Sequence, residues 1–320
     1  MHIECSAIVF SGALLIALAI DHYLGEPPAR LHPVVWMGNY LNWVAKQLQP
    51  NPSPAVRDLK SFWLAAAYWW AEAALVLIVS CSVQWAALAL PWYIAALILG
   101  LALKPMLAWS MLRSEVRAVK TALTQSLDAG RQRLAMLVSR DTANLSEAEV
   151  RESAIESLAE NLNDSVVAPI FWFVLLGLPG AALYRFANTA DAMWGYRGLR
   201  NGVNWEWAGK WAARADDVLS WLPARITALL LKLFSQGVDF KTLSVEARKT
   251  PSPNSGWPMA AMALALGVRL QKPGVYVLNA AGRPPAPPDV DLALKRASKV
   301  VVAAFLWAQA AILLIAYCTS

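Results

Sequence analysis

The sequence predicts an all-α, polytopic integral membrane protein with about four, and up to six, transmembrane helices. Of its 320 residues, 58% are hydrophobic and only 16% are charged, a balance typical of membrane proteins. The apolar residues gather in runs that approach the roughly 20 residues needed to cross the hydrocarbon core of a bilayer. Between these runs lie long polar stretches, mostly helical in character, which predict large helical loops. We therefore expect one membrane domain over residues 1–320.

Four apolar runs are the predicted spans. The first is short and has no basic residue before it, so we expect an uncleaved helix in place of a signal peptide. Only Cys81–Gln84 separate the second run from the third, which predicts a tight hairpin turn at these residues. The four spans cover residues 7–20, 62–80, 85–103 and 300–317.

A fifth apolar run, residues 166–186, is interrupted by helix-breaking residues. We expect it to be re-entrant, so that it enters and leaves the membrane on one face. A further crossing pair that includes the apolar helix at residues 218–234 would bring the total to six spans. The interruptions are Pro169, Gly177, Pro179 and Gly180.

Charge placement orients the spans. All 28 lysines and arginines lie between Arg30 and Lys299. By the positive-inside rule, the two ends of the chain and the 81–84 turn face outward and the long loops face inward. We therefore expect a multi-pass protein of the inner, or plasma, membrane whose active face is cytoplasmic. The basic residues are dispersed, without interleaved aromatics, so the net charge of +6 does not predict a nucleic-acid partner.

The stretch from Ser146 to Asp164 is the first candidate site. Ser146 and Glu149 form a capping box, which predicts a helix from about Glu147. Along this helix a carboxylate recurs at every fourth residue, opposite an apolar stripe. Like charges at this spacing cost an isolated helix roughly 0.2–0.5 kcal/mol per pair unless cations bind them, so the row predicts either a cation-binding face or a solvated acidic face. The polar stretches that surround it in the sequence favour the cation-binding face. The row consists of Glu152, Glu156, Glu160 and Asp164.

Three later polar islands add acidic, amide and arginine side chains. Carboxylate and amide oxygens are ligands that suit Mg²⁺, and arginine binds phosphate bidentately. Surface ion pairs are the alternative explanation for these residues. The third island, residues 250–263, combines a tight proline-rich loop with the start of a small-residue apolar helix, and the amides of such a loop suit an anion. The three islands contain Asn188, Asp191, Arg197, Arg214, Asp216, Asp217, Arg225 and Asn254.

Two familiar kinds of site are missing from the sequence. Neither a GxxxxGK[ST] phosphate loop nor a strand followed by GxGxxG is present, so a nucleotide would be bound in another way. The three cysteines are far apart in the sequence and predict neither a disulfide framework nor a zinc site.

Several of these stretches together resemble the CobD/CbiB family of cobalamin biosynthesis proteins. The resemblance runs in order over nearly the whole chain, and its most specific segments are ESLAENLND and NTADAMWGYR. It implies an integral membrane adenosylcobinamide-phosphate synthase. Such an enzyme joins a corrinoid, adenosylcobyric acid, to (R)-1-aminopropan-2-yl phosphate through an amide, with ATP consumed. Membrane lipid, other late-pathway cobalamin enzymes and a second copy of the chain are the expected partners.

Residue chemistry then suggests a role for each candidate in that reaction. Activation of a carboxylic acid with ATP and Mg²⁺ calls for metal-binding carboxylates, phosphate-binding arginines and a base for the ammonium. For the metal we expect Glu156, Glu160, Asp164, Asn161, Asn188 and Asp191; for substrate phosphates Arg140, Arg197, Arg214, Arg225 and Asn254; and as base Asp216 or Asp217, with His32 as a second candidate.

A non-catalytic function is the alternative. The broad architecture also resembles the AmpE-like membrane proteins, and in a sensor of that type the carboxylate row would be a cation-responsive or merely solvated face. Glu156→Gln distinguishes the two. Loss of function with normal membrane insertion favours the enzyme, and tolerance of the change favours the non-catalytic protein.

Overall fold

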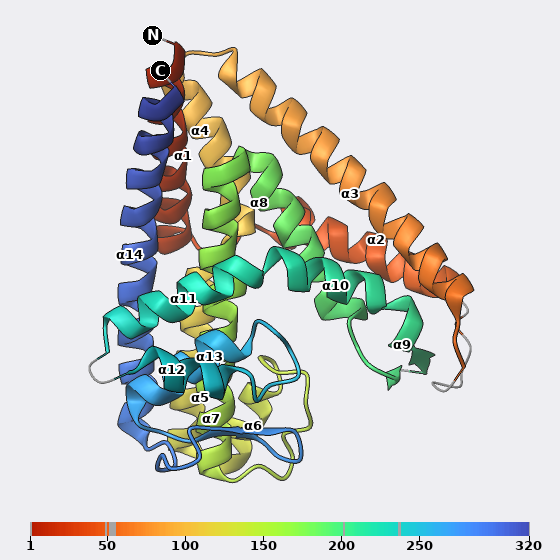
Figure 1. The fold of residues 1–320 in the computed structure, drawn as a ribbon, viewed down its shortest axis with the longest axis vertical. Helices are drawn as coiled ribbons and strands as arrows, with labels where there is room; N and C mark the ends of the chain where they lie inside the picture. The colour runs from red at the N-terminus through yellow and green to blue at the C-terminus, as the bar shows by residue number, and fades with distance from the viewer. Residues whose placement is uncertain (1, 49, 51–55, 201, 236–237, 320) are drawn as a thin grey trace. The chain divides into compact units, whose positions relative to one another are not determined.

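The computed structural model describes residues 2–48, 50, 56–200, 202–235 and 238–319. Helices dominate these residues, and the strands among them form only two short antiparallel hairpins. The predicted all-α fold class is therefore confirmed (Figure 1). The chain divides into two compact units, each of which is described by itself. Unit 1 comprises residues 1–107, 168–219 and 308–320, and unit 2 comprises residues 108–167 and 220–307.

Unit 1 is built mainly from long apolar helices. The described elements are α1 (His2–Tyr23), a 3-10 turn η1 (Ala29–Leu31), α2 (Pro33–Gln47), α3 (Leu59–Leu88), α4 (Trp92–Leu103), a second 3-10 turn η2 (Lys104–Met106), α8 (Ala168–Trp194), strands β1 (Leu199–Arg200) and β2 (Val203–Asn204), α9 (Trp205–Ala208) and α10 (Lys210–Leu219). The final residues of α14 (Pro287–Thr319) also belong to it.

Unit 2 is built from shorter and more polar helices. Its described elements are α5 (Trp109–Gln125), α6 (Leu127–Leu134), α7 (Glu147–Leu162), the π-helical stretch η3 (Asn163–Val167), α11 (Trp221–Leu233), α12 (Phe240–Ala247), α13 (Gly256–Leu266), strands β3 (Leu270–Lys272) and β4 (Tyr276–Leu278), and most of α14.

Four described segments are long and apolar enough to cross a membrane, as a polytopic membrane protein requires. The predicted first span, residues 7–20, lies in α1, whose apolar part is shorter than these four. The predicted span 300–317 lies within α14. The four segments are Leu59–Leu88, Trp92–Gln125, Glu147–Trp194 and Pro287–Cys318.

The hairpin between the second and third predicted spans lies later than expected. Helix α3 continues through Cys81–Gln84 to Leu88, and α4 begins only after Pro91. The prediction of a turn at 81–84 was therefore wrong. Nothing in these four residues breaks a helix, whereas Pro91 has no amide hydrogen to donate and fits the start of one.

Small residues let α1 and α4 pack closely. A Cβ added at Gly100 would lie 2.7 Å from Cγ2 of Ile16, so only glycine fits at this crossing. Ala13, Leu14 and Leu99 are completely buried nearby. Close backbone approach at small residues is the usual way in which membrane helices associate.

Helix α8 is broken at Gly177, inside the apolar run where the sequence predicts an interruption. Gly177 has φ +67°, a conformation that favours glycine, and the chain folds back there into two helical legs (Figure 1). The side chain of Gln84 on α3 meets the break, because its Oε1 accepts a 2.8 Å hydrogen bond from the amide of Leu178. A polar side chain from a neighbouring helix thus pairs a backbone group that the break leaves unpaired.

In unit 2, α7 lies among other elements on nearly all its sides. Both halves of the predicted capping box at Ser146 and Glu149 are present, so α7 begins where the sequence predicts. Val150 and Ala154 join a buried cluster with Val119 and Leu134 of α5 and α6. The opposite side of α7 is also buried, and it carries the carboxylates.

Candidate functional site

Two carboxylates of α7 are buried side chains in the interior of unit 2. Glu152 is 1% exposed and Glu156 is 4% exposed. Helix α7 packs against α13 and against the hairpin of β3 and β4, so its polar face is covered. The alternative of a solvated acidic face is therefore wrong for these two residues. Buried carboxylates are costly unless charged or hydrogen-bonding groups accompany them, which makes their surroundings informative.

Arg140 supplies the main counter-charge. Its Nη2 lies 2.5 Å from Oε2 of Glu156, and both side chains are shielded from solvent. The other oxygen of Glu156, Oε1, is buried and makes no hydrogen bond of standard geometry. The predicted metal ligand Glu156 and the predicted phosphate ligand Arg140 are thus direct neighbours.

The hairpin of β3 and β4 covers this carboxylate pair. Burial raises the pKa of the hydroxyl of Tyr276 on β4, and the negative charges of the nearby Glu156 and Glu160 carboxylates raise it further. Nη2 of Arg269, just before β3, lies 3.9 Å from Oε1 of Glu152. The geometry places two guanidinium groups and one phenol around two buried carboxylates.

The next residues of the row have different surroundings. Glu160 and Asp164 are only half-buried. Asn161 donates its side-chain amide to the carbonyl and hydroxyl of Ser157 within the same helix. The amide of Asn163 donates to Asp164 at 2.7 Å, while its oxygen accepts from Thr227 of α11. Because the π-helical stretch η3 begins at Asn163, the regular four-residue spacing ends before Asp164.

The donors in unit 2 fit one kind of magnesium ion. Within the described ranges, no group of three or more His, Cys, Asp and Glu side chains is placed to hold a metal. Magnesium that arrives with phosphate groups needs only one or two carboxylates, however, because phosphate and water supply the other ligands. Oε1 of Glu156, which makes no hydrogen bond of standard geometry, can serve as such a ligand. The residues thus fit a phosphate-bound ion better than a cage made by protein alone.

A second group of predicted residues comes together within unit 1. The amide of Asn188 on α8 donates to Asp216 on α10 at 3.3 Å. Burial raises the pKa of the neighbouring Asp217, and the charge of Arg197 opposes that shift. Arg214 is exposed on α10, and Asp191 is half-buried on the last turns of α8. Asn188, Asp216, Asp217 and Arg197 therefore form one polar group.

His32 belongs to a different network of unit 1. Its Nδ1 accepts the amide of Val34 at the start of α2, and its Nε2 lies 3.2 Å from Oε2 of Glu26. Glu26 and Asp21 flank the ammonium of Lys104, which is 2% exposed, at 2.8 and 3.1 Å. Both ring nitrogens of His32 are thus engaged, and the structure gives this residue a capping and pairing task.

Arg225 and Asn254 are neighbours in unit 2, as their common assignment to phosphate requires. Nη1 of Arg225 donates to Oδ1 of Asn254 at 3.1 Å. Burial lowers the pKa of the Arg225 guanidinium.

Sequence reasoning missed the partners that approach α7 from elsewhere in the chain. Arg269 precedes, and Tyr276 belongs to, a hairpin that was not predicted from the sequence, although Pro273–Gly274 between alternating residues is a turn signal. Glu152 belonged to the predicted row but received no role. Nothing in the sequence indicated that Lys104 is buried between two carboxylates, since a lysine after an apolar run is common.

Comparisons with known proteins agree with one another. The family model described as CobD/Cbib protein matches residues 14–305. The probable cobalamin biosynthesis protein CobD of Methanothermobacter thermautotrophicus is 40% identical over 83% of this chain and 86% of its own length. That of Thermococcus kodakarensis is 42% identical over 88% of both chains. The cobalamin biosynthesis protein CobD of Chromobacterium violaceum is 40% identical over 85% of both. No solved structure matches the chain.

Proposed function

Because the chain belongs to the CobD/Cbib family of cobalamin biosynthesis proteins, we propose that it is adenosylcobinamide-phosphate synthase. The proposed reaction joins adenosylcobyric acid to (R)-1-aminopropan-2-yl phosphate and uses ATP. The observation that carries the proposal beyond the family is the buried Arg140–Glu156 pair, in which the second carboxylate oxygen makes no hydrogen bond of standard geometry and has the Tyr276 hydroxyl nearby.

The chemistry that this ligase must perform has two steps. The carboxylate of adenosylcobyric acid attacks the γ-phosphorus of ATP, so that an acyl phosphate forms and ADP leaves. The amine then attacks the acyl carbon, inorganic phosphate leaves, and the nitrogen loses a proton. Both steps gather negative charge on phosphate oxygens, so catalysis depends on positioning and on charge neutralisation.

The side chains of unit 2 suit the phosphate chemistry. Arg140 and Arg269 provide guanidinium groups beside the α7 carboxylates, and Arg225 with Asn254 provides a second donor pair. Glu156, with Glu160 one turn later, would hold a magnesium ion that arrives with the nucleotide. When bound, this ion neutralises charge on the transferred phosphoryl group.

The polar group of unit 1 suits the amine. Asp217 is a base candidate because its raised pKa brings proton affinity closer to neutral pH, while Asn188 holds the neighbouring Asp216. Arg197 and Arg214 are candidates for the phosphate of the amine substrate. We propose these roles from residue chemistry within unit 1 alone.

A direct assay tests the proposed reaction. Purified protein in detergent is incubated with adenosylcobyric acid, aminopropanol phosphate, ATP and Mg²⁺, and adenosylcobinamide phosphate is followed by mass spectrometry. We expect product from the wild type, none from Glu156→Gln, and normal product from Glu147→Gln, an exposed glutamate on the same helix. Folded wild-type protein that forms no product would point to the AmpE-like sensor instead.

The proposed location follows from charge placement. We propose that the active face lies on the cytoplasmic side of the plasma membrane, where the basic loops are expected. Impermeant thiol reagents applied to intact cells test this orientation, because Cys318 is exposed in the last turn of α14, which is expected to lie toward the outside. Labelling of Cys318 only after cell lysis would place this end of the chain on the inside.

A further inference from the structure

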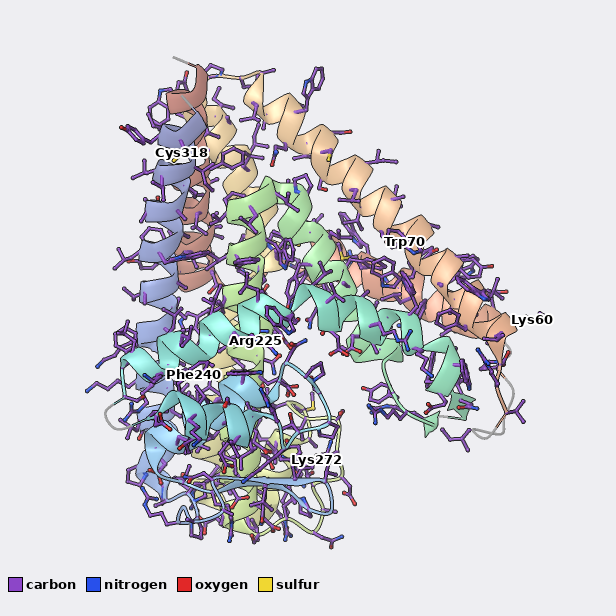
Figure 2. All side chains as sticks on the ribbon, viewed as in Figure 1. Lys60, Trp70, Arg225, Phe240, Lys272 and Cys318 are labelled. Atoms are coloured by element: carbon purple, nitrogen blue, oxygen red, sulfur yellow. The ribbon has the colours of Figure 1, made fainter. Side chains whose placement is uncertain are left out.

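A cavity among α11, α12 and α13 of unit 2 has the makings of a ligand site. Its volume is about 640 Å³, within the range of roughly 300–1,000 Å³ typical of small-molecule sites. Figure 2 labels two of its lining residues, Arg225 on α11 and Phe240 at the start of α12. The lining combines three aromatic rings, two arginines and several hydroxyl groups.

The first anchor of the cavity is Arg225. Its guanidinium carbon lies 4.2 Å from the ring centre of Trp221 and 4.9 Å from that of Trp257. Two further acceptors fix it, the carbonyl of Trp221 at 2.5 Å and that of Pro253 at 3.3 Å. The contacts of Arg225 among the described residues include no carboxylate, so its charge is held in place without being neutralised.

The second cation is Arg248, which follows α12 and is exposed. No ion pair is found for it among the residues that the structure describes. The nearby carboxylates are already engaged, because Asp239 accepts from Thr242 and Glu246 pairs with Lys249 and with the amide of Asn279. The cavity lining itself contains no acidic residue. Its electrostatic character therefore favours an anion.

Hydrogen bonds within the loop 250–255, which lines the cavity, hold its hydroxyl groups in place. The hydroxyl of Ser252 accepts the amides of Asn254 and Ser255, and the hydroxyl of Thr250 donates to the carbonyl of Ser252. A Cβ at Gly256 would lie 2.1 Å from the carbonyl oxygen of Ala247, so the start of α13, where the loop ends, lies directly against the end of α12. A ligand would meet hydroxyl groups that are already positioned, which lowers the ordering cost of binding.

The aromatic rings indicate what the anion is attached to. The ring of Phe240 lies 6.1 Å from that of Trp257, and the rings of Phe240 and Trp221 are both about half exposed. Aminopropanol phosphate has no planar group to cover these rings, whereas a purine does, and stacking on aromatic rings is how such bases are commonly held. A basic and aromatic cavity of this size matches a nucleotide better than a small phosphate ester.

We propose that this cavity binds the nucleotide of ATP, with the base against Trp221 and Phe240 and the phosphates toward Arg225 and Arg248. The proposal rests on the proposed function, from which it takes ATP as the phosphate-bearing substrate with an aromatic ring. It deepens that function, since it places the nucleotide on α11, α12 and the loop 250–255.

Equilibrium binding to the full chain in detergent tests the proposal. The probe is the β,γ-imido analogue of ATP with Mg²⁺, measured by isothermal titration calorimetry. Arg248→Gln should weaken binding about tenfold, as expected for the loss of one charge-assisted contact. Phe240→Leu should weaken it several-fold. Arg117→Gln, which removes another exposed arginine, this one from α5, should leave binding unchanged.

Other outcomes identify another occupant or none. Equal binding by wild type and Arg248→Gln, or no binding by folded wild type, overturns the proposal. If phosphatidylglycerol vesicles, and not the nucleotide analogue, bind in an Arg248-dependent way, the occupant is a lipid headgroup. If aminopropanol phosphate shows that dependence, the cavity holds the amine substrate.

The two proposals fail separately. An unchanged KM for ATP in an active Arg248→Gln enzyme removes the nucleotide from the cavity and leaves the ligase reaction standing. If nucleotide binding depends on Arg248 but the protein forms no amide product, the nucleotide stays assigned to the cavity and the ligase reaction is rejected.

Discussion

Nη2 of Arg140 lies 2.5 Å from Oε2 of Glu156, and the two side chains are 18% and 5% exposed. The pair joins the segment before α7 to the buried face of that helix. Since Glu156 is the more deeply buried partner, the two residues are not equivalent. Loss of the arginine strands a buried carboxylate, whereas loss of the glutamate leaves an arginine that can still reach solvent.

Arg140→Gln is therefore expected to destabilise the protein more than Glu156→Gln does. Removing one partner of a buried pair typically costs about 3–5 kcal/mol. The double variant should recover part of the stability lost in Arg140→Gln, because no unpaired charge then remains. Melting temperatures of the three variants in one detergent measure this, and equal losses from both single variants would contradict it.

Lys104 and Lys120 form a matched pair of lysines for a second prediction. Lys104 is buried between Asp21 and Glu26, whereas the Lys120–Asp291 pair is exposed. Lys104→Met should cost several kcal/mol, because it leaves two shielded carboxylates without their cation. Lys120→Met should cost about 1 kcal/mol or less. Thermal unfolding compares the two, and similar small losses would show that the buried network is weak.

The pH dependence of activity tests the role of Asp217. As a base it must be ionised, so activity is lost as pH falls through its pKa. Burial raises this pKa, which moves the acid limb of the rate profile above about pH 3.9, the value for an ordinary aspartate. Arg197 opposes the shift, so Arg197→Gln should move the limb to still higher pH. The control Arg117→Gln should leave the acid limb in place. An acid limb that also stays in place in Arg197→Gln would show that Asp217 is not the base.

The break in α8 gives a fourth prediction. A Cβ at Gly177 would lie 2.2 Å from Oε1 of Gln84, and φ is +67°; Gly267 has φ +65° but open space around it. Gly267→Ala should cost about 1 kcal/mol from backbone strain alone. Gly177→Ala should cost more, because it also displaces Gln84 from the amide of Leu178. Equal changes in melting temperature for Gly177→Ala and Gly267→Ala would show that Gln84 moves aside without loss of stability.

Local signals in the sequence predicted local features well. The capping box at Ser146 and Glu149 places the start of α7 correctly, because its geometry involves only four consecutive residues. The interruption of α8 is found within the predicted run, since Gly177 adopts a conformation that favours glycine. The later end of α3 was missed, because the lengths of the two apolar runs placed the turn in the four residues between them, whereas these residues are helical and Gln84 faces another helix.

The surroundings of the site could not be predicted in the same way. A four-residue period shows that Glu152 and Glu156 share a face, but not what covers that face. The cover comes from Arg269 and Tyr276, more than 100 residues later in the chain, and only tertiary structure brings them to α7. The period also assumes an uninterrupted α-helix, which the π-helical stretch η3 contradicts before Asp164.

The hydrogen bond from Leu178 to Gln84 also sets an order of events during membrane insertion. The apolar leg of α8 before the break, Ala168 to Leu176, is about 14 Å long at 1.5 Å per residue, roughly half the thickness of the hydrocarbon core. The hydrocarbon core of the bilayer offers no hydrogen-bond acceptor to the backbone amide at the tip of this hairpin. The hairpin is therefore stable in a bilayer only beside a helix that supplies an acceptor. Helix α3 leaves the ribosome about 90 residues earlier, and synthesis from the N-terminus thus provides the acceptor before the hairpin needs it.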